Sequence, residues 1–341
     1  MSHNTKTISH YEDTAYNSQD FPPQKPRREQ VFLRRMITKG KLFDFFHSTD
    51  TLCILAINDV SPSKMAQYEA FDDGNDLFWN EKVLTHSGYV FWGRVYNFIA
   101  TLSKACLLYM LPLSYTVAVL MWIFDDNVSN SETYGFILGL TIYGLLPSLL
   151  VYGHLRLVIS GHEYLAPFLK IQRVFQLDRT TGMVTLYKKG KPYFTHPFIE
   201  FDCVLMSAPT HQGLLNYSLV LIHRYHNYSV GVPLGAVRLG PNEKVIEYLR
   251  FWNMIQRYMD ISQPLPDIMM LEGVRQYDPT TITYDKEHNR NPRYWRDMTQ
   301  EEFVAQLNEI HAENQVTDCV GEIIDIFKVP KPLPKKHNKK K

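Results

Sequence analysis

The side chains of this chain that could do chemistry are scattered histidines and carboxylates. His223 and His226 stand three residues apart, and residues i and i+3 of a strand point to opposite faces. We therefore expect this pair at a strand end and turn, with no shared ligand. His154, His162 and Glu163 form a looser group, and a spacing of eight residues gives the two histidines no common face on a helix. Neither group predicts a metal centre.

No sequence pattern of a known catalytic or cofactor site is present. The chain has no GxGxxG, GxSxG or HExxH. A hydrolase that used Glu200 with His223 or His226 has no support in the spacing. Lys+Arg 36 against Asp+Glu 35 gives a net charge of +1, without the basic excess of a nucleic-acid-binding protein. The sequence thus predicts a protein that is not an enzyme and has no cofactor or nucleic-acid partner.

Two groups of lysines are suited to contact a membrane surface. Lys188, Lys189 and Lys191 cluster at an expected hairpin turn, and a second group lies in the tail at 335–341. A leaflet with anionic lipid attracts each such lysine by about 1 kcal/mol. We expect Lys188, Lys189 and Lys191 to contact lipid headgroups. The alternative is that these lysines serve only solubility.

Two uncharged apolar runs predict a pair of transmembrane helices. The runs cover residues 105–124 and 134–153. Each has about 20 residues, the length that crosses a hydrocarbon layer of ~30 Å. Pro112 and Pro147 lie within them, and proline is better tolerated in membrane helices than in soluble ones. Residues 105–153 are therefore expected to be a two-span hairpin in the lipid bilayer.

Charge in the flanks predicts the orientation of this hairpin. The connection 125–133 has three acidic residues and no Lys or Arg, whereas both outer flanks are basic. Basic flanks favour the cytoplasmic side, so both termini are expected in the cytoplasm and the protein in a plasma membrane. Gly135 and Gly139 form a GxxxG pattern, which would suit either close packing of the two spans or a homo-oligomer.

The pattern of the remaining chain predicts an α+β cytosolic region. Alternating apolar residues in 175–187 predict a β-hairpin that turns at 178–182, and further strand patterns follow to about 235. A helical pattern at 242–261 predicts an amphipathic helix that closes a small antiparallel β barrel or sandwich. Thr299 and Glu302 form a capping-box pattern for one more helix. The expected segments are a flexible tail (1–28), an N-terminal cytosolic segment and interfacial lead-in (29–104), the hairpin (105–153), a β-rich domain with its closing helix (168–262), a C-terminal irregular and helical extension (263–326) and a basic tail (327–341).

Two resemblances accompany these patterns. Two spans, a hairpin of the form F-x-L-D-R-x-T-G-x-V at 175–184 and a closing helix resemble bacterial membrane-anchored pleckstrin-homology-like modules. With the stretch PRYWRDMTQEEF at 292–303, the whole pattern looks like an uncharacterised bacterial two-transmembrane family encoded near type VI secretion effectors. That resemblance implies an inner-membrane accessory protein, an adaptor or immunity protein, that binds a secreted effector through its cytosolic domain. The alternative function is a toxin that permeabilises membranes through its hairpin.

Overall fold

The structure is a computed structural model, and it describes residues 10–26, 40–53, 79–124, 129–169, 171–209, 215–226, 230–234 and 245–328. The chain divides into two compact units. Residues 87–172 belong to a helical unit, and the residues on either side of this segment together make an α+β unit. The expected acidic connection at Asp125 and Asp126 lies outside the described residues.

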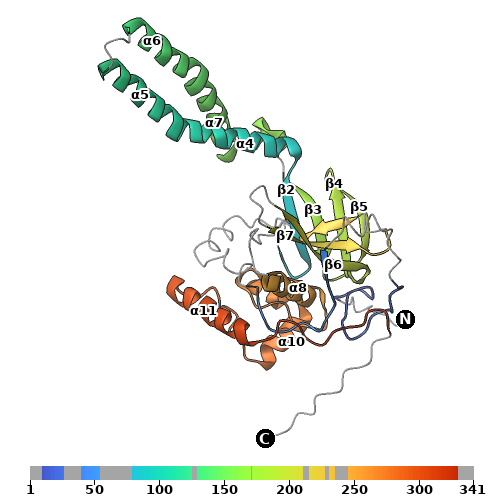
Figure 1. Ribbon diagram of the computed structural model, residues 1–341. Coiled ribbons are helices and arrows are strands. Elements are labelled where there is room, and N and C mark those ends of the chain that lie inside the picture. The colour runs from blue at the N-terminus through green and yellow to red at the C-terminus, as the bar shows by residue number, and fades with distance from the viewer. Residues whose placement is uncertain are drawn as a thin grey trace, which may run out of the picture. The chain divides into compact units, whose positions relative to one another are not determined.

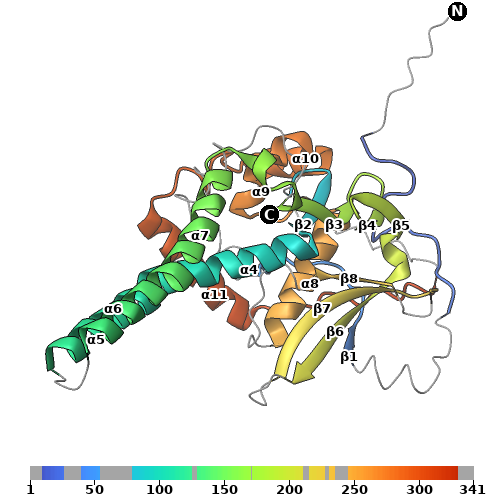
Figure 2. The same ribbon diagram turned by 90° about the horizontal axis from the view of Figure 1, so that it is seen from above.

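The helical unit is a hairpin of two long helices that run side by side (Figures 1 and 2). The first comprises α4 (Phe91–Ala105), a π-helical turn (Cys106–Met110) and α5 (Leu111–Phe124). The second comprises α6 (Asn130–Gly139), a π-helical turn (Leu140–Leu145) and α7 (Leu146–Ile159). Both helices are long and apolar enough to span a membrane, and they contain the two expected spans.

The two prolines explain where each helix changes its winding. Proline lacks an N–H group, and within an α-helix its ring would clash with the carbonyl four residues earlier. A π-helical turn ends two residues before Pro112, and a second ends two residues before Pro147. The wider π turn gives the ring room, so each helix continues beyond its proline.

Contacts between the two helices do not involve the expected glycines. Gly144 faces Leu111, and a Cβ on Gly144 would lie 2.9 Å from the Leu111 Cδ2. At Gly135 and Gly139 an added Cβ would meet no atom within 4 Å. These two glycines therefore make no close contact with the partner helix in the described chain, and a role in a homo-oligomer stays a prediction.

The strands of the α+β unit form two four-stranded sheets. One has the order β1 (Gly40–Phe43), β6 (Phe201–Pro209), β7 (Leu215–His223), β8 (Gly231–Pro233), and the other β2 (Val83–Tyr89), β3 (Ile171–Asp178), β4 (Met183–Lys188), β5 (Lys191–Pro197). The described strands do not close the expected barrel. After β5 a short 3₁₀ turn, Phe198–Glu200, passes the chain to the other sheet, so each sheet keeps its own edges.

Both tight turns of the β3–β4–β5 meander follow from local chemistry. The Asp178 carboxylate accepts hydrogen bonds from the N–H groups of Thr180 and Thr181, and Gly182 closes the turn at φ +69°. Lys189 and Gly190 have φ +53° and +76°, the double positive φ that a type I′ hairpin turn requires. The predicted hairpin and its second turn are confirmed.

Helix α8 (Val245–Met259) lies at the centre of the core rather than at its surface. Its polar face was expected in water, yet Asn253, Gln256 and Arg257 are buried. The segment 44–53 supplies hydrogen-bond partners to all three side chains. For example, the Phe46 N–H donates to the Gln256 Oε1 at 3.0 Å, and the Thr49 N–H donates to the Asn253 Oδ1 at 2.9 Å. The helix is therefore covered by chain on its polar face also.

Both ends of the chain contribute to this core. The expected flexible tail, 1–28, is wrong for residues 10–26, because Tyr16 and Phe21 are buried among core side chains. The N–H of Ile261 donates to the Tyr16 carbonyl at 2.9 Å. Near the other end, Phe46 forms a β-bridge with Ile323. The N-terminal segment thus folds onto the β strands, and residues 29–39 and 54–78 of the expected lead-in lie outside the described residues.

The extension after α8 holds short helices and one long one. These are α9 (Met269–Glu272), α10 (Pro279–Glu287) and α11 (Gln300–Val316). The predicted capping box is confirmed: the Glu302 N–H donates to the Thr299 Oγ1, and the Thr299 N–H donates to the Glu302 Oε2. Phe303, Leu307 and Ile310 face the core.

Candidate functional site

A chain of buried acids and bases fixes the extension against the β strands. Asp278 caps α10 by accepting the Thr281 N–H, and its carboxylate also pairs with Arg179, whose side chain is fully buried. Arg179 follows β3 in the turn and donates to the carbonyls of Tyr258, Asp260 and Gln263. This arginine therefore ties the meander, the end of α8 and the start of α10 together.

Two other arginines in the same region each form two hydrogen bonds with one carboxylate. Arg275 donates through Nε and Nη2 to the two oxygens of Asp285, at 2.9 and 2.6 Å. Arg290 makes the same two-bonded contact with Asp267, at 2.7 Å for each bond. Such paired bonds are stronger and more directional than those of lysine. They hold both guanidinium groups in fixed positions.

Glu272 is the buried acid that joins these arginines to the loop before α11. Its Oε1 accepts from Arg290 at 3.2 Å and from the Trp295 N–H at 2.8 Å, and its Oε2 accepts from the Arg296 N–H at 3.0 Å. The Arg296 guanidinium lies against Gly273, where a Cβ would overlap it. The loop 288–298 is therefore held by Glu272 and Asp267, and Gly273 leaves room for the Arg296 guanidinium.

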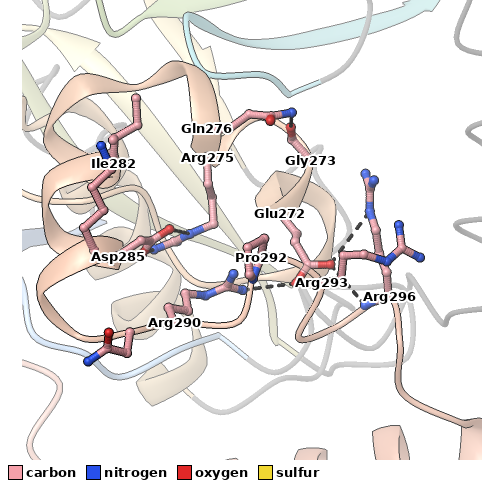
Figure 3. A pocket seen from close by; sticks show the side chains of 12 residues that line it. Glu272, Gly273, Arg275, Gln276, Ile282, Asp285, Arg290, Pro292, Arg293 and Arg296 are labelled. Carbon is pink, nitrogen blue, oxygen red and sulfur yellow. Dashed lines mark hydrogen bonds and ion pairs between the residues drawn. The ribbon is translucent and has the colours of Figure 1, made fainter.

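These side chains surround an open cavity of about 900 Å³ (Figure 3). Its walls come from α9, α10 and the loop before α11. The close view shows the contacts that join Glu272 to Arg290 and to Arg296. The lining residues are Glu272, Gly273, Arg275, Gln276, Ile282, Asp285, Lys286, Asn289, Arg290, Pro292, Arg293 and Arg296.

The lining is basic. It has five cationic side chains and two carboxylates. Asp267 and Asp297, which pair with Arg290 and Arg293, reduce the excess but do not reverse it. Burial would raise the pKa of Asp267, but the bonds from Arg290 and the charge of Arg275 outweigh it and hold that pKa below its usual value. Asp267 is therefore ionised at neutral pH and stays paired with Arg290.

Arginines at fixed positions around a cavity are suited to bind anions. Arg293 is 62% exposed at the rim, and Arg296 is 26% exposed. Both can turn a guanidinium toward a carboxylate or phosphate without breaking the buried pairs beneath. Lys286 adds a further cation to the same lining.

The residues singled out from the sequence lie elsewhere. Lys188, Lys189 and Lys191 are exposed at the β4–β5 turn, as expected of surface lysines. His154 is in α7, where its Nδ1 lies 2.5 Å from the Tyr96 hydroxyl, and His162 lies just beyond that helix. The structure does not bring these two histidines together at a shared ligand.

His223 and His226 were expected at a strand end and a turn, and this is where they lie. Because β7 ends at His223, the opposite-face rule for strands does not separate them. Their Nδ1 atoms are 3.3 Å apart, and His196 joins them. Glu200 accepts hydrogen bonds from His196 and His223, each at 3.0 Å. Burial lowers the pKa of His223, and the bond to Glu200 only partly offsets this.

The sequence contained a signal for the basic cavity. Residues 286–296, KEHNRNPRYWR, hold four cations within one turn-rich stretch between two helices. Cations concentrated in a loop between helices indicate a surface for anions more than a structural need. Comparisons with protein-family models, curated proteins and solved structures gave no match to this chain.

Proposed function

We propose that this protein is a membrane-anchored interaction protein without enzymatic activity, which crosses a bilayer as a two-helix hairpin and binds an acidic protein segment at the basic cavity of its α+β unit. Both termini and the α+β unit lie on the cytoplasmic side. In finer terms, the protein serves as an adaptor or immunity protein for a secreted effector at a bacterial inner membrane.

The observation that supports the anchor is the exposure of apolar side chains along the hairpin. Phe98 is 71% exposed, Tyr143 83% and Leu150 72%. Each large apolar side chain left in water forgoes about 1.5–3 kcal/mol relative to burial. In lipid this cost disappears, and every backbone group is already paired within a helix.

The lengths of the helices support a hairpin that extends beyond the bilayer. The first helix has 34 residues, which at 1.5 Å per residue is about 50 Å, more than the ~30 Å of a hydrocarbon layer. Arg94 and Lys104 lie in its N-terminal part, and Arg156 lies near the end of the second helix. Basic residues in these positions favour the cytoplasmic side for both outer ends.

The binding role is supported by the cavity. Arg275 and Arg290 are positioned by two-bonded pairs with carboxylates, and the more exposed Arg293 and Arg296 lie where an anion can reach them. A carboxylate-rich protein segment offers several anions at once, which matches the breadth of a 900 Å³ opening.

Membrane attachment is tested by fractionation of cells that produce the full chain. We expect the protein in the membrane pellet after ultracentrifugation and an alkaline carbonate wash, and its release by detergent. Recovery in the supernatant before detergent would contradict the anchor. A reporter fused into residues 125–133 that behaves as cytoplasmic would contradict the orientation.

Partner binding is tested by in-cell cross-linking and purification from detergent, with two charge-matched variants. We expect the double variant Arg293→Glu, Arg296→Glu to lose a captured partner by about tenfold or more, which corresponds to ~1.4 kcal/mol. The control, Lys188→Glu with Lys189→Glu, makes the same charge change at the β4–β5 turn and should retain the partner. Equal capture by all three proteins would contradict the cavity as the site. If the α+β unit loses its association with the membrane only in the Lys188→Glu, Lys189→Glu variant, the result supports contacts between the β4–β5 turn and lipid headgroups instead.

A membrane-permeabilising toxin is the rival function. The exposed apolar hairpin suits a toxin as well as it suits an anchor. Expression in a host that lacks the partner distinguishes the two functions. Growth arrest that requires residues 105–153 would support the toxin, whereas normal growth supports the anchored binding protein.

A further inference from the structure

A cluster of three imidazoles and one carboxylate lies at the point where the chain passes between the two sheets. His196 is near the end of β5, Glu200 ends the 3₁₀ turn, and His223 is the last residue of β7. Phe201 begins β6 and pairs with His223 across the sheet, which brings Glu200 and His223 together. His226 follows in the turn after β7. Four side chains from three segments thus meet at one place.

The rings are close enough to share one ion. One ligand atom from each of His196, His223 and His226 lies within 4.8 Å of the others. The ring centroids of His196 and His223 are 4.3 Å apart, and those of His223 and His226 are 5.0 Å apart. In a tetrahedral site with metal–nitrogen bonds of about 2.0–2.1 Å, ligand nitrogens lie about 3.4 Å apart. A contraction of up to about 1.4 Å would therefore bring the nitrogens to that spacing, and an ion on the His223 Nδ1 would replace the hydrogen bond that this atom accepts from the His226 N–H at 3.1 Å.

The differences in burial allow that contraction. The His223 side chain is 1% exposed and is held by its neighbours, while that of His196 is 32% exposed. His226 is exposed. Two of the three rings can therefore turn toward the fixed one. Phe194 packs against all three imidazoles, with centroid distances of 4.4–5.1 Å, and closes the apolar side of the cluster.

Glu200 adds a carboxylate bonded to two of the imidazoles, an arrangement that is common beside metal-bound histidines. Its Oε2 lies 3.0 Å from the His196 Nδ1 and 3.0 Å from the His223 Nε2. A carboxylate bonded to ligand imidazoles fixes their orientation and raises their basicity, as in carboxylate–histidine–zinc arrangements.

We propose that His196, His223 and His226 bind a divalent transition-metal ion, with Glu200 as the carboxylate that orients His196 and His223. Three imidazoles prefer Zn²⁺, Cu²⁺ or Ni²⁺ to the oxygen-seeking Mg²⁺ and Ca²⁺. Because the site joins β5, the turn into β6 and the end of β7, a bound ion would connect the two sheets at their crossover. This inference does not depend on the proposed membrane anchoring or on the basic cavity.

The test measures zinc binding by the full chain in detergent, purified through a tag without histidine and stripped with a chelator. Zinc chloride is titrated against a chromogenic zinc indicator, and the metal is counted by mass spectrometry. We expect one equivalent of zinc and a rise in Tm, with no effect of Mg²⁺. Cobalt in place of zinc should give the visible absorption bands of a nitrogen-rich tetrahedral site.

Variants assign the ligands. We expect His196→Ala and His226→Ala, both at exposed or partly exposed positions, to weaken zinc binding at least tenfold, and the double variant to abolish it. Glu200→Gln should weaken it by about 10–100-fold, the usual effect of losing a partner of a ligand. His288→Ala, an exposed histidine at the end of α10, is the control and should bind zinc normally.

Two results would overturn the proposal. One is an equivalent of zinc that persists in the His196→Ala, His226→Ala double variant, which would place the ion elsewhere. The other is no binding to the wild-type chain at micromolar zinc, which would leave the cluster as a hydrogen-bonded structural contact. Circular dichroism of each variant distinguishes a lost ligand from a lost fold.

Discussion

Replacement of Arg179 by methionine should destabilise the α+β unit more than any surface change. The Arg179 and Asp278 side chains are both fully buried and pair at 2.9 Å. The guanidinium also donates to backbone carbonyls at the end of α8 and just beyond it. Methionine fills a similar volume but makes none of these bonds. It would leave the Asp278 carboxylate without its cation, although the Tyr11 hydroxyl would still donate to it at 2.6 Å.

The magnitude follows from the groups left behind. Breaking a buried ion pair by removing one partner costs about 3–5 kcal/mol. A buried carbonyl that loses its donor adds about 1–3 kcal/mol when no water reaches it. We therefore expect a loss of about 4–8 kcal/mol in the free energy of unfolding, a large part of the ~5–15 kcal/mol of a whole domain. The matched control is Arg293→Met, which breaks the exposed pair with Asp297 and should cost less than ~0.5 kcal/mol.

Urea unfolding of the detergent-solubilised chain measures this difference. Trp252 and Trp295 are buried in the α+β unit, so their fluorescence shifts when that unit unfolds. Trp92 and Trp122 in the hairpin are already exposed and should change little. A loss below about 1 kcal/mol for Arg179→Met, or an equal loss for Arg293→Met, would refute the reasoning that this pair ties the core together.

Three further predictions concern pH, helix packing and the hairpin. Burial opposes ionisation of Asp278, but the charge of Arg179 and the bonds to Thr281 and Tyr11 leave its folded pKa below the usual value. The stability that ionised Asp278 contributes is therefore complete above the unfolded pKa of about 3.9 and is lost as the pH falls through the folded pKa. When the urea midpoint is plotted against pH, the Asp278→Asn variant should show a smaller fall at acid pH than the wild-type chain. Gly144→Val should lower the thermal stability of the hairpin in detergent by about 1–3 kcal/mol, because its Cβ would press on Leu111, whereas Gly139→Ala should be neutral or slightly stabilising. Replacement of residues 90–170 by a short Gly/Ser connection should give a water-soluble protein that keeps the β content of the α+β unit, because β2 and β3 are neighbours in one sheet. An aggregated product without a β-sheet signal in circular dichroism would contradict this.

The features that could be predicted from the sequence are those set by neighbouring residues. Asp178 and Gly182 define a turn through their own side-chain and backbone preferences, and Thr299 with Glu302 defines a helix start. The two apolar helices follow from length and hydropathy alone. None of these elements needs a distant partner to form.

The features that could not be predicted depend on partners far along the chain. Helix α8 has a polar face that is typical of a surface helix, and only the segment 44–53, some two hundred residues earlier, buries it. The pairing of β1 with β6 has no local signal either. His196 stands 27 residues before His223, and only the switch of the chain between sheets brings the two together. Alternating apolar and polar residues show that a strand exists but not which sheet it joins. For this reason the sequence left a barrel and a sandwich open, and only the structure shows two separate four-stranded sheets.

The pairing of β1 with β6 also sets the order of events during synthesis. Phe43 pairs with Cys203, and the whole hairpin lies between them in the chain. At ~5–20 residues per second, a ribosome needs roughly 10–30 s to make the intervening stretch. Under the proposed membrane anchoring, the hairpin enters the bilayer during that time, while the aromatic segment around Phe43, Phe45 and Phe46 waits without its sheet. A chaperone that covers this segment, or stalling of the nascent chain near residue 200, would therefore control how much folded protein a cell obtains.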